Sequence, residues 1–210
     1  MIIGSISENE SSEKRISITP EIAKKYISLG VQVQLSKGYG RHLGFIQSDF
    51  EEKGVKIIDD NKTLIQNSDI IIQMNLIDDN HLSFLKSEQT YIGVLNSYEN
   101  MDKLLELSKK NINFFSLELL PRITRAQSMD ILSSQANLAG YKAVLESFSV
   151  FEKAIPMMMT AAGTIPAAKV LVVGAGVAGL QAIATAKRMG AIVFATDVRM
   201  ASKEQVESLG

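Results

Sequence analysis

The sequence contains no cysteine and no tryptophan, and only two of its 210 residues are histidine. Without cysteine, disulfide bonds and thiolate chemistry are excluded, and a reducing compartment is compatible with the composition. No apolar run approaches the roughly 18 residues that crossing a bilayer requires. Residues 1–7 lack the basic and long apolar regions of an export signal. We therefore expect a cytoplasmic chain without direct membrane insertion.

An excess of charge of either sign is also missing. The chain has 22 basic and 23 acidic residues and a formal net charge of −1. This balance gives no electrostatic reason to expect a nucleic acid or an anionic membrane as partner. No set of residues with metal-ligand spacing stands out, so we predict no metal. The hydrophobic fraction of 46% is sufficient for ordinary buried cores, and disorder is not expected.

Short apolar runs alternate with amphipathic segments over the first 120 residues. This alternation predicts a mostly parallel sheet covered on both faces by helices. The first helix has a clear start signal, with Thr19 as N-cap and Pro20 at the first helical position, and it should stop at Gly30. The strands are expected at 2–7, 31–35, 55–58, 69–75, 91–96 and 112–120, and the later helices at 48–53, 61–67, 79–88 and 101–110.

The pattern divides the chain into an N-terminal α/β domain (1–125), a connecting helix and linker (126–166) and the start of a second α/β domain (167–210). In the connector, a stripe of apolar and small residues predicts a long, closely packed helix from about 126 to 153. The three methionines at 157–159 are expected to serve as adaptable packing. The fold class is therefore α/β with two Rossmann-like domains and mostly parallel sheets. We expect the second domain to be truncated after its first β-α-β unit.

That second domain opens with an apolar strand, 169–173, which runs into a Gly-x-Gly-x-x-Gly turn. Gly174 would make the tight turn, Gly176 would admit the pyrophosphate of a dinucleotide, and Gly179 would let the following helix approach the strand. Asp197 ends the next strand at the spacing expected of a ribose-binding carboxylate, which favours NAD over NADP, although Arg199 runs against that preference. A flavin site or an unliganded α/β domain is the alternative. The cofactor-binding residues predicted on this basis are Gly174, Ala175, Gly176, Val177, Gly179, Asp197, Val198 and Arg199.

A dense polar loop lies between the predicted strand 112–120 and the long helix. Its side chains should project at the carboxyl end of a strand, where open α/β sheets bind ligands. Arg122 and Asp130 offer the donor and the acceptor that would orient a nicotinamide carboxamide, and Gln127 and Ser133 add neutral hydrogen bonds. Orientation is the main contribution a protein makes to hydride transfer. The alternative is that Arg122 and Asp130 form an ordinary surface ion pair.

The histidines are poorly placed for acid–base chemistry, which a dehydrogenase acting on an alcohol or an amino acid needs. His42 lies in a glycine-rich loop, where it should be exposed or brace the loop. His81 lies on the polar side of an amphipathic helix and should be solvated.

Four segments, Arg15–Glu21, Glu118–Tyr141, Pro156–Pro166 and Gly174–Gly210, resemble the NAD(H)-binding component, the first domain of the alpha subunit, of proton-translocating NAD(P) transhydrogenase. The resemblance implies that NADH bound here passes a hydride directly to NADP⁺ on a partner domain, coupled to proton translocation by a membrane domain. It also implies an NADP(H)-binding membrane beta subunit as partner, a homodimer, and attachment to the cytoplasmic face of the inner membrane through partner subunits. We expect activity only in a complex and in a longer chain. By the same resemblance the residues that position the nicotinamide are Arg122, Gln127, Asp130 and Ser133.

Two other functions remain open at this stage. An alanine dehydrogenase-like oxidoreductase shares the fold and the Arg15 region, but that family places a lysine near the end of the fourth strand and a histidine at the fifth. Here those neighbourhoods read 72–76 Ile-Gln-Met-Asn-Leu and 92–96 Ile-Gly-Val-Leu-Asn, without either group. An inactive, truncated NAD-binding module is the other alternative.

Overall fold

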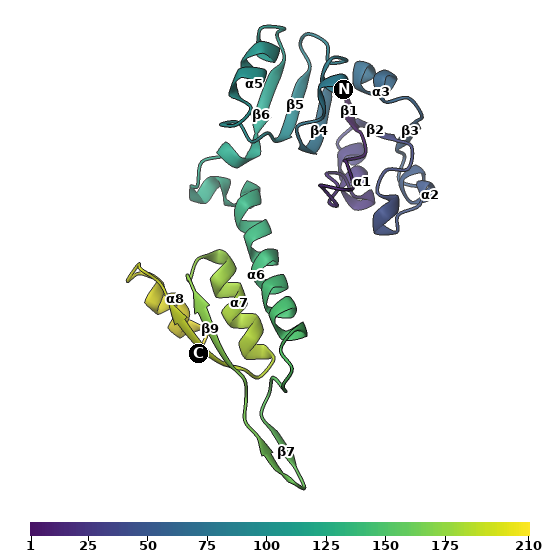
Figure 1. Cartoon of the computed structure of the whole chain (residues 1–210). Helices are drawn as coiled ribbons and strands as arrows, with labels where there is room; N and C mark the ends of the chain where they lie inside the picture. Colours follow the sequence, from purple (N-terminus) through teal and green to yellow (C-terminus); the bar gives the residue numbers. More distant parts are fainter. The chain divides into compact units, whose positions relative to one another are not determined.

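The computed structural model describes all residues, 1–210, and the chain separates into two compact units, Met1–Ala126 and Gln127–Gly210 (Figure 1). The long helix that was predicted as part of a connector belongs to the second unit. The predicted three-part division of the chain stays a prediction. None of the helices combines the length and the apolar character that crossing a bilayer requires.

The first unit is built on one six-stranded sheet in the order β3-β2-β1-β4-β5-β6, and every neighbouring pair is parallel. This confirms the predicted α/β class with a parallel sheet. The strands are β1 Ile2–Ser5, β2 Gln32–Ser36, β3 Lys56–Ile58, β4 Ile70–Asn75, β5 Thr90–Val94 and β6 Asn113–Ser116. The helices are α1 Pro20–Ser28, α2 Gln47–Glu51, α3 Asn61–Asn67, α4 Asp79–Leu82 and α5 Met101–Ser108, with 3₁₀ turns η1 Arg41–Leu43, η2 Leu117–Leu119 and η3 Thr124–Met129.

Both faces of this sheet are buried, as the alternation of strands and helices predicted. Successive residues of β4 point to opposite faces: Ile71 packs with Leu64 of α3, whereas Ile70 and Ile72 pack in the cluster that contains Ala23 of α1. Ile71, Leu64 and Ala23 are fully buried. The two clusters fix the register of the central strands, because a shift by one residue would exchange the faces.

Two elements of the first unit end earlier than predicted. The strand 112–120 stops at Ser116, because the Glu118 carboxylate accepts hydrogen bonds from the backbone N–H groups of Leu95 (3.2 Å) and Ser97 (3.1 Å) and bends the chain into η2. The helix 79–88 stops at Leu82. Beyond it the side chain of Gln89 accepts from the Lys86 N–H at 2.5 Å, so a side chain replaces helical hydrogen bonding there.

The second unit pairs a two-stranded parallel sheet with two long helices that lie side by side (Figure 1). Its core contains Val144, Ala186 and Ala191, with Phe148 and Val170 packed against them. The opposite face of the sheet is exposed and apolar. The elements are α6 Ile131–Ser149, β7 Met158–Thr160, β8 Gly163–Ile165, β9 Lys169–Val173, α7 Val177–Arg188, β10 Ile192–Thr196 and α8 Ser202–Ser208, and the exposed apolar residues of the sheet are Leu171, Val173, Ile192 and Phe194.

Three predictions for the second unit need correction. The long helix begins at Ile131 and not at 126, because Asp130 caps it. The predicted stripe is partly wrong, since Gly140 and Val144 are its buried residues while Leu132 is exposed. The linker is not irregular but forms the antiparallel hairpin β7–β8, in which the methionines at 157–159 are all exposed and pack against nothing in the chain.

Candidate functional site

The glycine turn between β9 and α7 has the conformation that a dinucleotide requires. Gly174 has a φ of +95°, in the left-handed region that favours glycine, and its N–H donates to the Thr196 carbonyl at 2.7 Å. A Cβ on Gly179 would collide with the carbonyl oxygen of Gly174, so only glycine lets α7 come this close to the turn. A Cβ on Gly176 would meet no atom within 4 Å, which leaves that backbone accessible from outside.

The first turn of α7 is free of a side-chain cap. Gly176 is the N-cap residue and has no side chain to accept from the first N–H groups of the helix. These groups and the positive end of the helix dipole suit a phosphate or pyrophosphate. Ala175 is buried inside the turn, whereas Val177 is exposed at its surface. The residues present therefore fit the pyrophosphate of a dinucleotide.

Asp197 follows β10 directly, and its carboxylate is tied to the glycine turn. Its Oδ2 accepts from the N–H of Ala175 at 2.7 Å, and its Oδ1 accepts from the N–H of Arg199 at 2.8 Å. The Arg199 guanidinium completes the set with donors at 3.0 and 3.1 Å. The guanidinium and these N–H groups hold the pKa of the Asp197 carboxyl well below its ordinary value. The side chain is therefore an anion, and Val198 beside it is fully exposed.

The polar loop brings two of its four predicted side chains into contact. Asp130 is the N-cap of α6, and its carboxylate accepts from the Ser133 N–H at 2.9 Å and from the Ser133 hydroxyl at 2.6 Å. The capping fixes the position of both side chains. Gln127 is exposed in η3, and Arg122 is exposed in the last residues of the first unit. The nicotinamide-positioning role of the four residues stays a prediction.

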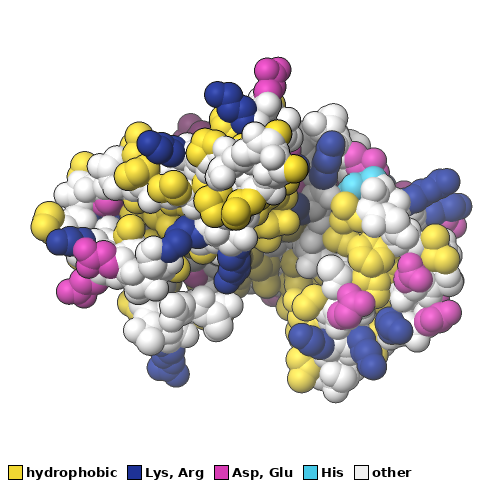
Figure 2. All heavy atoms as spheres, turned by 90° about the horizontal axis from the view of Figure 1, so that it is seen from below, with side chains coloured by type: hydrophobic (Ala, Val, Ile, Leu, Met, Phe, Trp, Pro, Cys, Tyr) yellow, Lys and Arg dark blue, Asp and Glu magenta, His cyan; other side chains and the backbone are white.

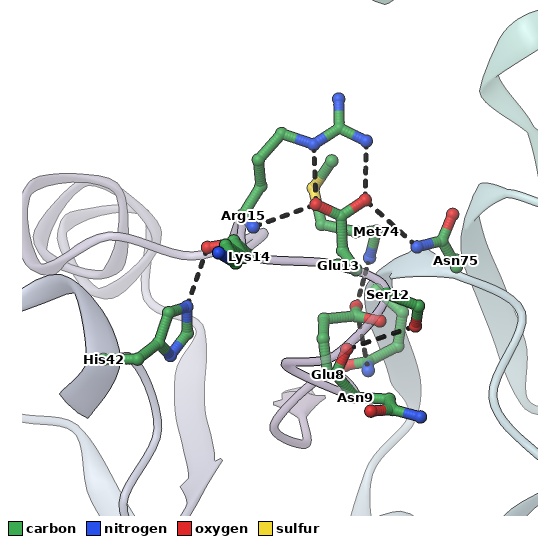
Figure 3. Close-up of polar contacts among 10 residues, drawn as sticks. Glu8, Asn9, Ser12, Glu13, Lys14, Arg15, His42, Met74 and Asn75 are labelled. Carbon is green, nitrogen blue, oxygen red and sulfur yellow. Dashed lines mark hydrogen bonds and ion pairs between the residues drawn. The ribbon is translucent and has the colours of Figure 1, made fainter.

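A second polar cluster, in the first unit, lies at the carboxyl ends of β1 and β4 (Figure 3). The Glu13 carboxylate accepts from Nε and Nη2 of Arg15 at 2.8 and 2.6 Å and from Nδ2 of Asn75 at 3.1 Å. These hydrogen bonds, above all those from Arg15, lower the pKa of Glu13 to about 2. Sequence reasoning noted Arg15 only through a resemblance and missed Glu13. The Glu-x-Arg spacing just after the first strand was the available signal.

Glu8 and Gln73 extend this cluster into the interior. Glu8 accepts from the Met74 N–H at 2.6 Å and from the Gln73 amide at 3.2 Å, and burial raises its pKa. Gln73 is buried and also accepts from the Ile6 N–H at 2.9 Å, so it braces β1 against β4. The strand ends at which an alanine dehydrogenase-like chain would carry a lysine and a histidine thus hold structural amides and no acid–base pair.

The histidines behave differently from each other. His42 braces its loop as predicted, with Nε2 2.7 Å from the Lys14 carbonyl oxygen. The prediction that His81 is solvated is wrong. Its Nδ1 lies 2.6 Å from Asp78, its Nε2 lies 3.1 Å from the Asn61 amide, and its ring meets Phe84 edge-on. Asp78 also caps α4, so the histidine is drawn into a capping interaction.

A strand, a glycine turn, an uncapped helix and a second parallel strand ending in aspartate define a nucleotide-binding α/β protein of the Rossmann type. The N-terminal domain model of the alanine dehydrogenase/PNT family matches residues 4–139, and the C-terminal domain model matches residues 143–210. The chain therefore belongs to the alanine dehydrogenase/PNT family of oxidoreductases.

Within this family the chain is more similar to transhydrogenase subunits than to alanine dehydrogenases. It is 47% identical to the first part of NAD(P) transhydrogenase subunit alpha of Rickettsia prowazekii and 45% identical to that of Rhodospirillum rubrum, covering 100% and 97% of this chain and 56% and 54% of those relatives. The crystal structure of a transhydrogenase from Sinorhizobium meliloti superposes with a TM-score of 0.94 at 44% identity, over 100% of this chain and 63% of that one. The resemblance seen in the sequence is confirmed.

An alanine dehydrogenase of Methanococcus maripaludis is 24% identical over 94% of this chain and 53% of that protein. The chain spans about half the length of the curated relatives it matches.

Proposed function

We propose that this chain is the NAD(H)-binding component of a proton-translocating NAD(P) transhydrogenase. The observation that carries the proposal is the glycine turn at 174–179 bonded to Asp197, an arrangement that fits an unphosphorylated dinucleotide. The relatives of highest identity given above are named as alpha subunits of that enzyme. NADH would be the hydride donor, and NADP⁺ would be bound on a partner domain.

The residues of the second unit divide the work between holding and orienting. The glycine turn and the first turn of α7 would hold the pyrophosphate, and Asp197 would accept from the adenosine ribose hydroxyls. The dihydronicotinamide itself supplies the hydride chemistry when bound. Asp130 and Ser133, fixed by the cap of α6, would accept from and donate to its carboxamide. Arg122 and Gln127 would complete that set.

The chain's polar residues agree with a reaction that moves no proton at the site. Transfer of hydride between two nicotinamides needs no general acid or base, and both histidines are engaged in bracing and capping contacts. Proton translocation would belong to a membrane partner, as the resemblance to transhydrogenase implies. We place the chain at the cytoplasmic face of the inner membrane, held by an NADP(H)-binding beta subunit in the membrane.

A homodimer is the assembly we propose for this component. In the hairpin β7–β8 the side chains of Met157, Met158, Met159 and Ile165 are 61, 46, 82 and 41% exposed. Hydrophobic side chains also lie open on the face seen in Figure 2, toward which the hairpin points in Figure 1. Flexible methionine side chains suit burial against a second copy. Sedimentation equilibrium that showed only monomers would contradict this assembly.

The test of the function is a titration of the chain with NADH, followed by nicotinamide fluorescence, with NADPH as the matched control. Saturable binding of NADH, with NADPH at least about tenfold weaker because of the Asp197 carboxylate, is the expected result. If NADH binds neither to this chain nor to the complete protein, the transhydrogenase proposal is wrong.

A further inference from the structure

The carboxylate that should select the cofactor is already saturated by its own chain. Asp197 accepts four hydrogen bonds: one from the Ala175 N–H, one from the Arg199 N–H, and two from the Arg199 guanidinium, at 3.0 and 3.1 Å. A carboxylate has about four lone-pair positions, so no acceptor position is left for a ribose. The Asp197 side chain is also only 10% exposed.

The four donors differ in how easily they can leave. The N–H of Ala175 is fixed by the glycine turn, and the N–H of Arg199 belongs to the tight turn that follows β10. The guanidinium lies at the end of a side chain that is 60% exposed. A ribose diol can therefore reach Asp197 only where the guanidinium now stands, and Arg199 is the donor that must move.

Next to this carboxylate lies a hollow of about 310 Å³, which is large enough for part of a nucleoside. It is lined on one side by Asp197 and Thr196 and on the other by Arg199 and Lys203 of the α8 region. Lys203 is paired with Glu207 at 3.7 Å. A guanidinium displaced from Asp197 would remain at the rim of this hollow, where a ribose 2′-substituent would lie.

We propose that Arg199 is a specificity-determining residue of this site, with two opposed effects. In the free protein it occupies the ribose-binding edge of Asp197 and so weakens NADH binding. It is also a latent ligand for a 2′-phosphate, which the Asp197 carboxylate keeps out by repulsion and by holding the guanidinium. This inference rests on the proposed NAD(H)-binding function and deepens it.

The first consequence concerns NADH. Arg199→Ala removes the competing donors and leaves the backbone N–H groups and Asp197 in place. Exposed ion pairs contribute roughly 0.2–1 kcal/mol, so the dissociation constant for NADH should fall by about two- to fivefold. The gain should shrink at high salt, because screening weakens the competing pair.

The second consequence concerns NADPH. Asp197→Asn keeps an oxygen for the Ala175 N–H but removes the negative charge. NADPH should then bind with micromolar to millimolar affinity, and this binding should weaken by about tenfold or more in the double variant Asp197→Asn/Arg199→Ala, because a charge-assisted contact to phosphate is lost.

The experiment measures the dissociation constants of NADH and NADPH, with the melting temperature as a check of folding. It compares the wild-type chain, the two single variants and the double variant, with Arg188→Ala, an exposed arginine elsewhere on α7, as control. Tighter NADH binding by Arg199→Ala alone, together with Arg199-dependent NADPH binding in the Asp197→Asn background, supports the inference. If the wild type binds NADH and Arg199→Ala binds it equally or more weakly, the inference is wrong while the proposed function stands. If no variant binds either nucleotide, both fail.

Discussion

Two glycines of the nucleotide turn, Gly176 and Gly179, are constrained in different ways. Gly176 has φ and ψ of −77° and −167°, which any residue adopts, and a Cβ there meets nothing within 4 Å. A Cβ on Gly179 would instead run into the carbonyl oxygen of Gly174. The fold thus explains glycine at 179 but not at 176, where close approach of a ligand is the remaining reason.

This difference predicts opposite outcomes for two alanine substitutions. Gly176→Ala should leave the melting temperature nearly unchanged and raise the dissociation constant for NADH roughly tenfold or more, since a methyl group of about 1.4 kcal/mol effect stands where the pyrophosphate should lie. Gly179→Ala should lower the melting temperature. Unchanged NADH affinity in a folded Gly176→Ala chain would contradict the placement of the pyrophosphate.

The Glu13–Arg15 pair predicts a pH dependence of stability. The pKa of Glu13 falls from the ordinary 4.5 to about 2 in the folded chain, so the pair stabilises the fold above pH 4.5, and this contribution is lost as the pH falls toward 2. Arg15 is half exposed, so the effect should be modest. We expect Glu13→Gln to lower the melting temperature by about 1–4 °C at pH 7, and by progressively less as the pH falls through this window.

Thermal unfolding between pH 7 and pH 2 measures this difference, with Glu106→Gln on the exposed side of α5 as control. Glu8, whose raised pKa works in the opposite direction, is present in both chains and largely cancels in the comparison. A wild-type-minus-variant difference that stays constant down to pH 2 would refute the assignment.

At the scale of elements, the packing of α6 on α7 decides the shape of the second unit. Gly140, in the middle of α6, is buried, and a Cβ there would overlap the carbonyl oxygen of Ala178 in the first turn of α7. The two helix backbones therefore touch at the helix end that should hold the pyrophosphate. The small residue at 140 positions the phosphate-binding turn as well as the core.

The substitution Gly140→Ala tests this contact through the sign of its effect. In an ordinary helix interior this change stabilises by roughly 0.5–1 kcal/mol, whereas here overpacking should destabilise by about 1–3 kcal/mol. Denaturant unfolding measures the change, and Asn137→Ala, at an exposed position of the same helix, should stabilise slightly. Stabilisation by Gly140→Ala would show that the helices can separate without cost.

The elements that the sequence predicted well are those with local signals. The start of α1 follows from Thr19, which caps it, and from Pro20, and the parallel sheet follows from the alternation of apolar runs. The hairpin β7–β8 was missed, because its strands are three residues long and carry no periodicity. The buried face of α6 was misjudged because a glycine, which scores as neutral, is the residue in closest contact.

For the candidate site, sequence spacing was sufficient to group the glycines with Asp197, and the Ala175–Asp197 hydrogen bond joins them in the structure. It was not sufficient to find what the carboxylates already bind. The pairs Glu13–Arg15 and Asp197–Arg199 each join residues two positions apart, and such short-range partners depend on rotamers and turns that spacing alone does not determine.

At the scale of the whole molecule, the chain carries the residues for one nucleotide, and the proposed reaction needs two. A hydride moves between nicotinamides only at a separation of roughly 3–3.5 Å, so the protein's contribution is the orientation of one ring toward the other. In this chain that contribution falls on side chains held by a helix cap, a rigid element, and not on the exposed hairpin. Orientation and affinity should therefore be separable by mutation.

Asp130→Asn in the complete, assembled transhydrogenase tests this separation. Asparagine caps a helix as well as aspartate, so α6 and the melting temperature should be preserved, while the charge that accepts from the carboxamide is lost. We expect the hydride-transfer rate to fall by about 10- to 100-fold and the NADH dissociation constant to change by less than about threefold. Single-turnover kinetics and nicotinamide fluorescence measure the two quantities on the same preparation, with Ser134→Ala, an exposed neighbour, as control. Equal losses in rate and in affinity would mean that Asp130 holds the cofactor and does not orient it, and the loop would then belong to the binding surface alone.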